Sequence, residues 1–360
     1  MKGRLLSLDV LRGLDMVLLT VVGPLQNGWR LSWGIPKWVT LQFSHLWSGF
    51  TLWDLILPLF IFMSGAAVPL ALSKRMEDGR AGRAYWKHVA TRFAMLYVLG
   101  FVAGGSIFKL DPMLLSPIGN TLQVIAVGYL FAALVLPLKS RFLRIAPFAA
   151  FLAVYGAVLL AFGDWTPDGN AAVKFDKWVF GFVFPPESVV FRPRGYSKLL
   201  TLPLYGFMTV AGLEATLVLR SGWSERRKAL TLAVAGVALA AAGWVLVPWI
   251  PMIKHIFSPS FTLAAAGYSV VLLAICYFAV DVCGARRGLW LLLLYGQTSL
   301  AAYMLYTFFA PAVNAVASAA TVGVARIWPA AGPFAASLAS AAFITWTLYL
   351  WRGNKVKTGR

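Results

Sequence analysis

Long apolar runs follow one another along almost the whole chain, separated by short stretches of proline, glycine and charged residues. A helix needs about 20 apolar residues to cross the hydrocarbon core of a membrane, and most of these runs have that length. They predict an all-α, polytopic membrane bundle of about ten transmembrane helices. The expected spans are residues 8–24, 50–73, 89–108, 118–138, 143–162, 197–219, 229–249, 260–280, 289–312 and 331–351.

The composition agrees with this pattern. Of the 360 residues, 60% are hydrophobic and 12% are charged, whereas soluble domains are about 45–50% apolar and about 25% charged. This excludes a water-soluble globular protein, a disordered chain and a coiled coil. Ten spans leave little room for a separate soluble domain, so we expect one transmembrane domain over residues 1–360.

Positive charge is unevenly distributed between the loops. The net charge is +19, which in a soluble protein would suggest nucleic-acid binding. With the amino terminus in the cytoplasm, however, the ten-span arrangement places about two thirds of the Lys and Arg residues inside, as the positive-inside rule requires. We therefore expect both termini in the cytoplasm and membrane lipid, not nucleic acid, as the partner of the basic loops.

Ionisable residues inside apolar runs are costly and mark candidate sites. The first cluster is Asp9, Arg12 and Asp15, in which Arg12 lies three residues from each carboxylate and can pair with either on a helix. One interpretation is a neutral ion network that orients the first helix. The other is that Arg12 holds an anionic group that enters from the cytoplasm.

The second cluster precedes and opens the second expected span. His45 lies just before this span on the outer side, and Asp54 lies about one turn inside it. Imidazole is the natural proton acceptor near neutral pH, and a buried carboxylate can orient it. The alternative is an ordinary interfacial histidine.

Several further polar residues fall within or beside apolar runs, and together they suggest a polar cavity through the bundle. Each can also be explained by a hydrogen bond to another helix. They are Asn120, Gln123, Glu214, Lys254, His255, Gln297, Thr298, Ser299 and Tyr303. The chain has three histidines and two cysteines, without metal-ligand spacing, so we expect neither a metal nor a disulfide framework.

Some of these segments resemble the heparan-alpha-glucosaminide N-acetyltransferase family, and the bacterial members that look most similar are of the DUF5009 or NagX type. The resemblance spans nearly the whole chain, and its amino-terminal pair of motifs is fairly specific. The segments are RLLSLDVLRG at residues 4–13, His45 to Asp54 followed by LPLFIFMSG at 57–65, NTLQ at 120–123, PMIK at 251–254 and GQTSLAAY at 296–303.

The resemblance implies a transmembrane acyltransferase of the bacterial inner membrane. It would take an acetyl group from cytoplasmic acetyl-CoA and deliver it to an amino sugar or glycan, glucosamine-like compounds first, on the periplasmic side. The family's catalytic histidine and aspartate map onto His45 and Asp54. Three positions depart from the family pattern: His45 is one residue closer to Trp47 and Gly49, and Gly23 and Thr298 each stand in place of an asparagine.

Candidate binding residues follow from this reaction. The anionic nucleotide of acetyl-CoA should meet basic residues at the cytoplasmic mouth, with Gln123 deeper along the path. The expected donor-binding residues are Arg12, Arg92, Gln123 and Arg226, and the expected acceptor-binding residues are Asp15, Lys254, His255 and Tyr303.

Two alternatives remain open. A permease for N-acetylglucosamine or a similar sugar would use the same polar path without a thioester, although clearly related halves are not visible in the sequence. A second alternative is a retained fold with a decayed catalytic centre, to which the departures at Gly23 and His45 would point. A homodimer is also left open.

Overall fold

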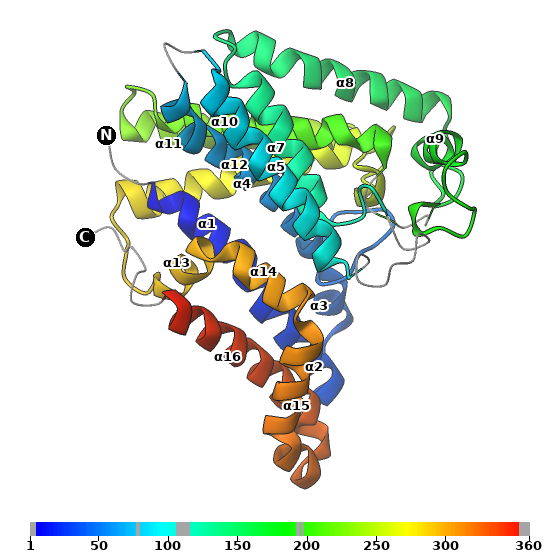
Figure 1. Ribbon diagram of the computed structural model, residues 1–360, viewed down its shortest axis with the longest axis vertical. Helices are drawn as coiled ribbons and strands as arrows, with labels where there is room; N and C mark the ends of the chain where they lie inside the picture. Colours follow the sequence, from blue (N-terminus) through cyan, green and yellow to red (C-terminus); the bar gives the residue numbers. More distant parts are fainter. Residues whose placement is uncertain (1–4, 77–79, 106–115, 192–194, 196–197, 353–360) are drawn as a thin grey trace. The chain divides into compact units, whose positions relative to one another are not determined.

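The computed structural model describes residues 5–76, 80–105, 116–191, 195 and 198–352. Helices make up the fold, and the described residues contain no β-strand (Figure 1). The basic end segments 1–4 and 353–360, on which part of the predicted orientation depends, lie outside these ranges.

Within the described ranges, seven helices are long and apolar enough to cross a membrane, which identifies a membrane protein. Their mean hydropathy is high, and several are largely unburied by protein, as is expected of helices that meet lipid. These seven are Leu52–Arg75, Arg141–Ala161, Leu199–Leu219, Glu225–Val245, Pro259–Val282, Ala310–Ile327 and Pro329–Arg352.

The chain divides into two compact units. The first comprises the described parts of Met1–His45, Thr51–Ile56 and Leu272–Arg360. Its helices are α1 (Leu6–Val17), α2 (Gly23–Trp33), α3 (Lys37–Gln42), α13 (Trp290–Gln297), α14 (Ser299–Thr307), α15 (Ala310–Ile327) and α16 (Gly332–Arg352). A π-helical turn, Leu18–Val22, joins α1 to α2, and a 3-10 turn, Leu52–Leu55, precedes Ile56.

Close backbone contacts hold α1 against α13. A Cβ atom at Gly13 would overlap the carbonyl oxygen of Leu292, and one at Gly296 would overlap the carbonyl oxygen of Asp9. Glycine at both positions therefore lets the two backbones approach, as small residues do in membrane helix pairs.

The carboxylate of Asp281 accepts hydrogen bonds from the amides of Leu6 (3.3 Å) and Ser7 (3.2 Å), so the start of α1 is capped from a distant part of the chain.

The second unit comprises Leu46–Phe50 and Leu57–Val271. Its helices are α4 (Ile56–Leu72), α5 (Arg83–Ala103), α7 (Thr121–Val135), α8 (Arg141–Ala161), α9 (Ala171–Phe180), α10 (Leu202–Leu219), α11 (Glu225–Val245) and the larger part of α12 (Pro259–Cys276). Short 3-10 turns occupy Ser73–Arg75, Val189–Phe191, Leu199–Thr201 and Lys254–Ile256.

Helix α10 lies at the centre of this unit and packs on α4 and α7. The Thr209 hydroxyl donates to the Gly128 carbonyl (2.8 Å), and the Thr216 hydroxyl donates to the Ala66 carbonyl (2.8 Å).

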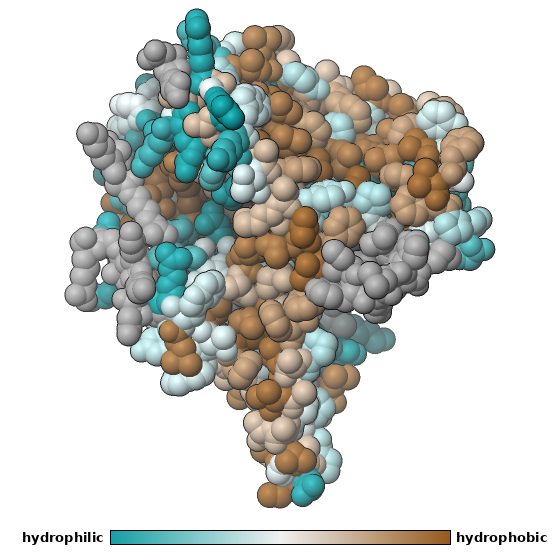
Figure 2. All heavy atoms as spheres, in the orientation of Figure 1, coloured by the Kyte–Doolittle hydropathy of each residue, from teal (hydrophilic) through white to brown (hydrophobic). Residues whose placement is uncertain are grey.

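Apolar side chains show along α8, and hydrophilic ones gather where α5 begins (Figure 2). The exposed basic residues there are Lys74, Arg75, Arg80, Arg83 and Lys87.

The last part of the chain differs from the sequence expectation. The expected span 289–312 contains two short helices separated at Thr298, and residues 310–327, most of which lie outside the expected spans, form the apolar helix α15. Helix α13 ends and α14 begins at Thr298, because the backbone of this residue leaves helical geometry (φ −121°, ψ 22°).

Candidate functional site

His45 and Asp54 are in direct contact within the first unit. The Nδ1 atom of His45 lies 2.9 Å from Oδ1 of Asp54. The Asp54 side chain is 1% exposed, whereas that of His45 is 32% exposed. A carboxylate can only accept, so this contact places the hydrogen on Nδ1 and leaves the lone pair of the neutral imidazole on Nε2.

Thr51 fixes the other oxygen of Asp54. The Thr51 amide donates to Oδ2 of Asp54 (3.1 Å), and the Thr51 hydroxyl lies 2.9 Å from the same atom. This is a capping box at the start of the 3-10 turn Leu52–Leu55, and acidic residues are favoured there because the helix N-terminus is positive. The same carboxylate therefore begins the helix and orients the imidazole.

The loop before Asp54 is tied to the residues around His45. The Thr51 hydroxyl also lies 2.9 Å from the carbonyl oxygen of Ser44, and the amide of Leu52 donates to Oε1 of Gln42 (3.1 Å). These contacts join the segment that carries His45 to the one that carries Asp54. Together with the His45–Asp54 contact, these hydrogen bonds set the position of the imidazole.

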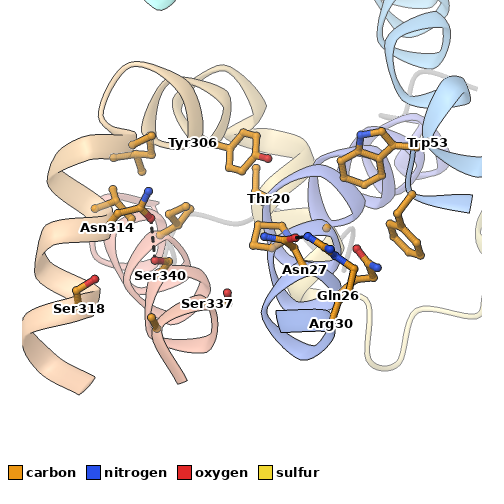
Figure 3. A pocket seen from close by; sticks show the side chains of 18 of the residues that line it. Thr20, Gln26, Asn27, Arg30, Trp53, Tyr306, Asn314, Ser318, Ser337 and Ser340 are labelled. Carbon is orange, nitrogen blue, oxygen red and sulfur yellow. Dashed lines mark hydrogen bonds between the residues drawn. The ribbon is translucent and has the colours of Figure 1, made fainter. Parts of the chain in front are cut away.

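A cavity of about 770 Å³ lies in the same unit. Two of its lining residues, Ser44 and Trp53, immediately precede His45 and Asp54 in the chain. Figure 3 shows two facing walls, one with Thr20, Gln26, Asn27, Arg30 and Trp53, the other with Asn314, Ser318, Ser337 and Ser340. The size is typical of a small-molecule site, and the walls are rich in amide and hydroxyl groups.

Gly23 makes room for Trp53 at this cavity. A Cβ atom at Gly23 would overlap the six-membered ring of the Trp53 indole. The ring also packs on Phe43, with centroids 5.5 Å apart. The departure from asparagine at position 23 therefore has a steric reason in this chain, because a side chain there would displace the indole beside Asp54.

Three other sequence-predicted residues lie in the first unit. Arg12 pairs with Asp9 at 3.7 Å (Nη1 to Oδ1). Asp15 is fully buried in α1, and neither of its carboxylate oxygens has a hydrogen-bond partner among the described residues. Tyr303 is buried in α14. Neither Asp15 nor Tyr303 is among the described residues that line the cavity, and their acceptor-binding role stays a prediction.

The other residues predicted to bind the donor or the acceptor lie in the second unit, in separate surroundings. The guanidinium of Arg92 lies over the Tyr129 ring, 4.8 Å from its centroid. Arg226 is exposed on the first turn of α11. Lys254 and His255 are buried in a 3-10 turn, where the His255 ring stacks on Trp47 (centroids 5.3 Å apart).

Gln123 has a local structural contact. Its Oε1 atom accepts hydrogen bonds from the amides of Gly119 (2.8 Å) and Asn120 (2.9 Å), which completes a capping box at the start of α7. This arrangement uses the side-chain oxygen within the loop. Its geometry gives no support to the donor-binding role that we predicted for Gln123.

Glu214 forms an ion network in the second unit. Its carboxylate contacts Arg144 and, at 3.3 Å, Arg141. The Arg144 side chain is buried, and it also donates to the carbonyl of Leu138 (2.7 Å). The network explains Glu214 as a partner for two arginines, which is one of the alternatives that the sequence left open.

Sequence reasoning missed most of the cavity wall. Gln26, Asn27, Arg30 and Asn314 of that wall were not singled out, and neither was Thr51, which contacts Asp54. Arg30 was a visible signal, because it is a charged residue six positions after the first expected span. The described residues contain no group of three His, Cys, Asp or Glu side chains that could bind a metal ion.

Comparison with curated proteins finds no match for the chain. A protein family does match its amino-terminal part, and the matched stretch contains both His45 and Asp54 as well as Gly23 and Arg30. Residues 4–111 match the family described as Domain of unknown function (DUF5009).

Proposed function

We propose that the protein is a membrane acyltransferase that moves an acetyl group from acetyl-CoA to the amine of a sugar. The observation that carries this proposal is the contact between His45 Nδ1 and Asp54 Oδ1, with Thr51 holding the second carboxylate oxygen. A histidine oriented by a buried carboxylate, with its other nitrogen left basic, is the arrangement that acyl transfer requires.

Aminolysis of a thioester needs an acceptor for the amine proton. In direct transfer, Nε2 of His45 takes that proton while the new N–C bond forms and the C–S bond breaks, and the proton then leaves with the thiolate as free thiol. In a two-step route, Nε2 first accepts the acetyl group with loss of the thiolate, and the amine then attacks the acetyl-imidazole. In both routes Asp54 stabilises the positive charge that develops on the ring.

The acceptor would occupy the polar cavity of the first unit. Hydroxyl and amide side chains on both walls suit the many hydroxyl groups of a sugar, and Trp53 and Tyr306 offer aromatic surfaces. Arg12, Arg92 and Arg226 stay candidates for the nucleotide end of acetyl-CoA, because each lies on the side that the charge distribution assigns to the cytoplasm.

The proposal includes a topology. Ten crossings with cytoplasmic termini, in a bacterial inner membrane, fit the distribution of basic loops when α13, α14 and α15 together form one interrupted crossing. His45 then lies on the outer side of the membrane, opposite the source of acetyl-CoA. The acetyl group would cross the membrane by way of the protein.

Transport is the second candidate function, and one observation favours it. A helix interruption occurs at Thr298 in the unit that holds the cavity, and the described part of this unit also has π-helical turns at Leu18–Val22 and Tyr277–Val282. Interrupted helices are typical of secondary transporters at their substrate sites. Counterflow of N-acetylglucosamine in proteoliposomes that contain no CoA would support a permease.

The test of acyl transfer uses the purified full-length protein with acetyl-CoA and glucosamine, and measures free thiol over time. Wild-type protein should release thiol in an acceptor-dependent manner, and His45→Ala should reduce the rate by at least about 100-fold. His88→Ala removes an imidazole elsewhere and should retain the rate. Full turnover in His45→Ala would exclude the proposed mechanism.

A further inference from the structure

The charge of the cavity in the first unit is unbalanced. Among the described residues that line it, Arg30 is the charged side chain, and no aspartate or glutamate is present. Arg30 is exposed, and a guanidinium at the rim of a cavity favours an anion or a carboxylate that faces it. The cavity therefore has the electrostatics of a site for a ligand with a negative charge.

Arg30 is held at the wall by its own helix. Its Nη2 atom donates to Oδ1 of Asn27 (2.8 Å), one turn earlier in α2 (Figure 3). Guanidinium has five N–H donors in a rigid fork, and this contact uses one of them. The remaining donors suit bidentate binding of a carboxylate or a phosphate.

Neutral donors near Arg30 point to the same class of ligand. The Nε2 atom of Gln26 is buried at this wall and has no hydrogen-bond partner among the described residues. A buried amide without a partner is costly, and rotation of the Gln26 side chain toward the cavity would let an acceptor on a ligand bind it. Across the cavity, the Ser340 hydroxyl donates to Oδ1 of Asn314 (3.2 Å), which leaves the Asn314 amide nitrogen for a ligand oxygen.

The positive charge also bears on the amine. A cation in the cavity disfavours the ammonium form of a bound amino sugar, and only the neutral amine can attack a thioester. A compensating anionic group on the same ligand would let Arg30 contribute to binding as well. An acidic group on the sugar would pair with Arg30 and offset its effect on the amine, so Arg30 favours an acidic sugar through binding.

We propose that this cavity binds a sugar bearing one anionic group, a carboxylate or a phosphate ester, and that Arg30 is the residue that recognises the anion. The identification of the ligand as a sugar rests on the proposed function, whereas the anion preference rests on Arg30, Asn27 and Gln26. Arg30 thereby sets which acceptors are used.

Binding is measured by titration calorimetry on the full-length His45→Ala protein, in which turnover is blocked. The probes are glucosamine, glucosamine 6-phosphate, muramic acid and inorganic phosphate. The two acidic sugars should bind at least about tenfold more tightly than glucosamine, which corresponds to about 1.4 kcal/mol. Arg30→Gln should remove that difference, Arg30→Lys should retain part of it, and Arg326→Gln, which removes an exposed arginine of α15, should leave it unchanged.

Each contrary result overturns a defined part of the inference. Equal affinity for all three sugars, or an unchanged preference in Arg30→Gln, excludes anion recognition by Arg30. Inorganic phosphate that binds as tightly as the sugar phosphate excludes a sugar site. Thiol release with glucosamine but without a charge preference refutes only this inference, whereas a charge preference without thiol release from any probe refutes only the acyltransferase.

Discussion

The indole of Trp53 lies in the space that a side chain at Gly23 would fill. This pair links the start of α2 to the residue that precedes Asp54, so the absence of a side chain at position 23 helps to set the geometry of the candidate site. A position that looked like a loss of catalytic chemistry in the sequence is thus also a packing requirement.

Gly23→Ala should destabilise the protein. The new methyl group would overlap the Trp53 ring, and overpacking of this kind costs about 1–3 kcal/mol. Thermal unfolding of the detergent-solubilised protein should show a lower Tm, and any acyl transfer should fall with it. Gly222→Ala is the matched control, because no heavy atom lies within 4 Å of a Cβ at that position. Equal Tm values for the two variants would refute the packing relationship.

Asp54→Asn should reduce acyl transfer strongly while the fold is retained. The amide has the size of the carboxylate but cannot hold His45 in the same way or stabilise its charged form, and general acid–base contributions are about 100- to 10,000-fold. Thr51→Val, which removes one hydroxyl near Asp54, should cost roughly tenfold. Initial rates of thiol release measure both. If Thr51→Val reduced the rate more than Asp54→Asn, Thr51 would not act through Asp54 as proposed.

The ion network at Glu214 predicts a ranking of stability. Glu214→Gln leaves the buried Arg144 without its carboxylate, and such a loss costs about 3–5 kcal/mol. Arg141→Gln should cost at most about 1 kcal/mol, because the Arg141 side chain is 64% exposed. Chemical denaturation compares the two variants, and a larger loss in Arg141→Gln would contradict the assignment of Arg144 as the main partner.

Asp176 on α9 predicts a pH dependence of stability. Burial raises the pKa of this carboxyl to about 6, although the Leu199 amide and the Lys198 ammonium act in the opposite direction. The folded state therefore favours the protonated form, and the stabilisation is complete below about pH 4 and is lost as the pH rises through 6. Asp176→Asn should flatten this part of the Tm-against-pH curve. A wild-type curve that rises between pH 4 and pH 7, with Asp176→Asn unchanged, would contradict this reading.

The proposed topology places the two ends of α8 on opposite sides of the membrane. Cysteines introduced at Lys139 and Phe182, both exposed, in a background without Cys276 and Cys283 should react differently with an impermeant maleimide. Phe182→Cys should label in intact cells, and Lys139→Cys only after permeabilisation. Labelling of both from one side would refute the ten-crossing arrangement.

The sequence was sufficient to predict the helical membrane fold and to select His45 and Asp54. These two residues are only nine positions apart and lie on either side of a helix start, so their contact can be expected from the local sequence. The cavity was not predictable in the same way, because its walls come from α2, α15 and α16, far apart in the chain. Nothing in the local pattern pairs Arg30 with Asn314.

The number of spans shows a related limit. Apolar runs identify helices but not their interruptions. The π-helical turn Leu18–Val22 lies just before Pro24, which cannot donate a backbone hydrogen bond, whereas the break at Thr298 has neither a proline nor an ionised residue beside it. Small residues such as those of α15 fit a loop, a packed helix or a lipid-facing helix equally well on composition alone. Tertiary packing decides among these, and one sequence does not contain that information in a local form.

The most direct measurement of the central claim is acetyl transfer across a sealed membrane. Proteoliposomes with the protein in one orientation are loaded with acetyl-labelled CoA, and glucosamine or glucosamine 6-phosphate is added outside. The account predicts labelled N-acetyl sugar in the external medium, dependent on His45, with free CoA thiol retained inside. Labelled sugar that forms only when acetyl-CoA and sugar share a compartment, or that forms equally in His45→Ala, would contradict it.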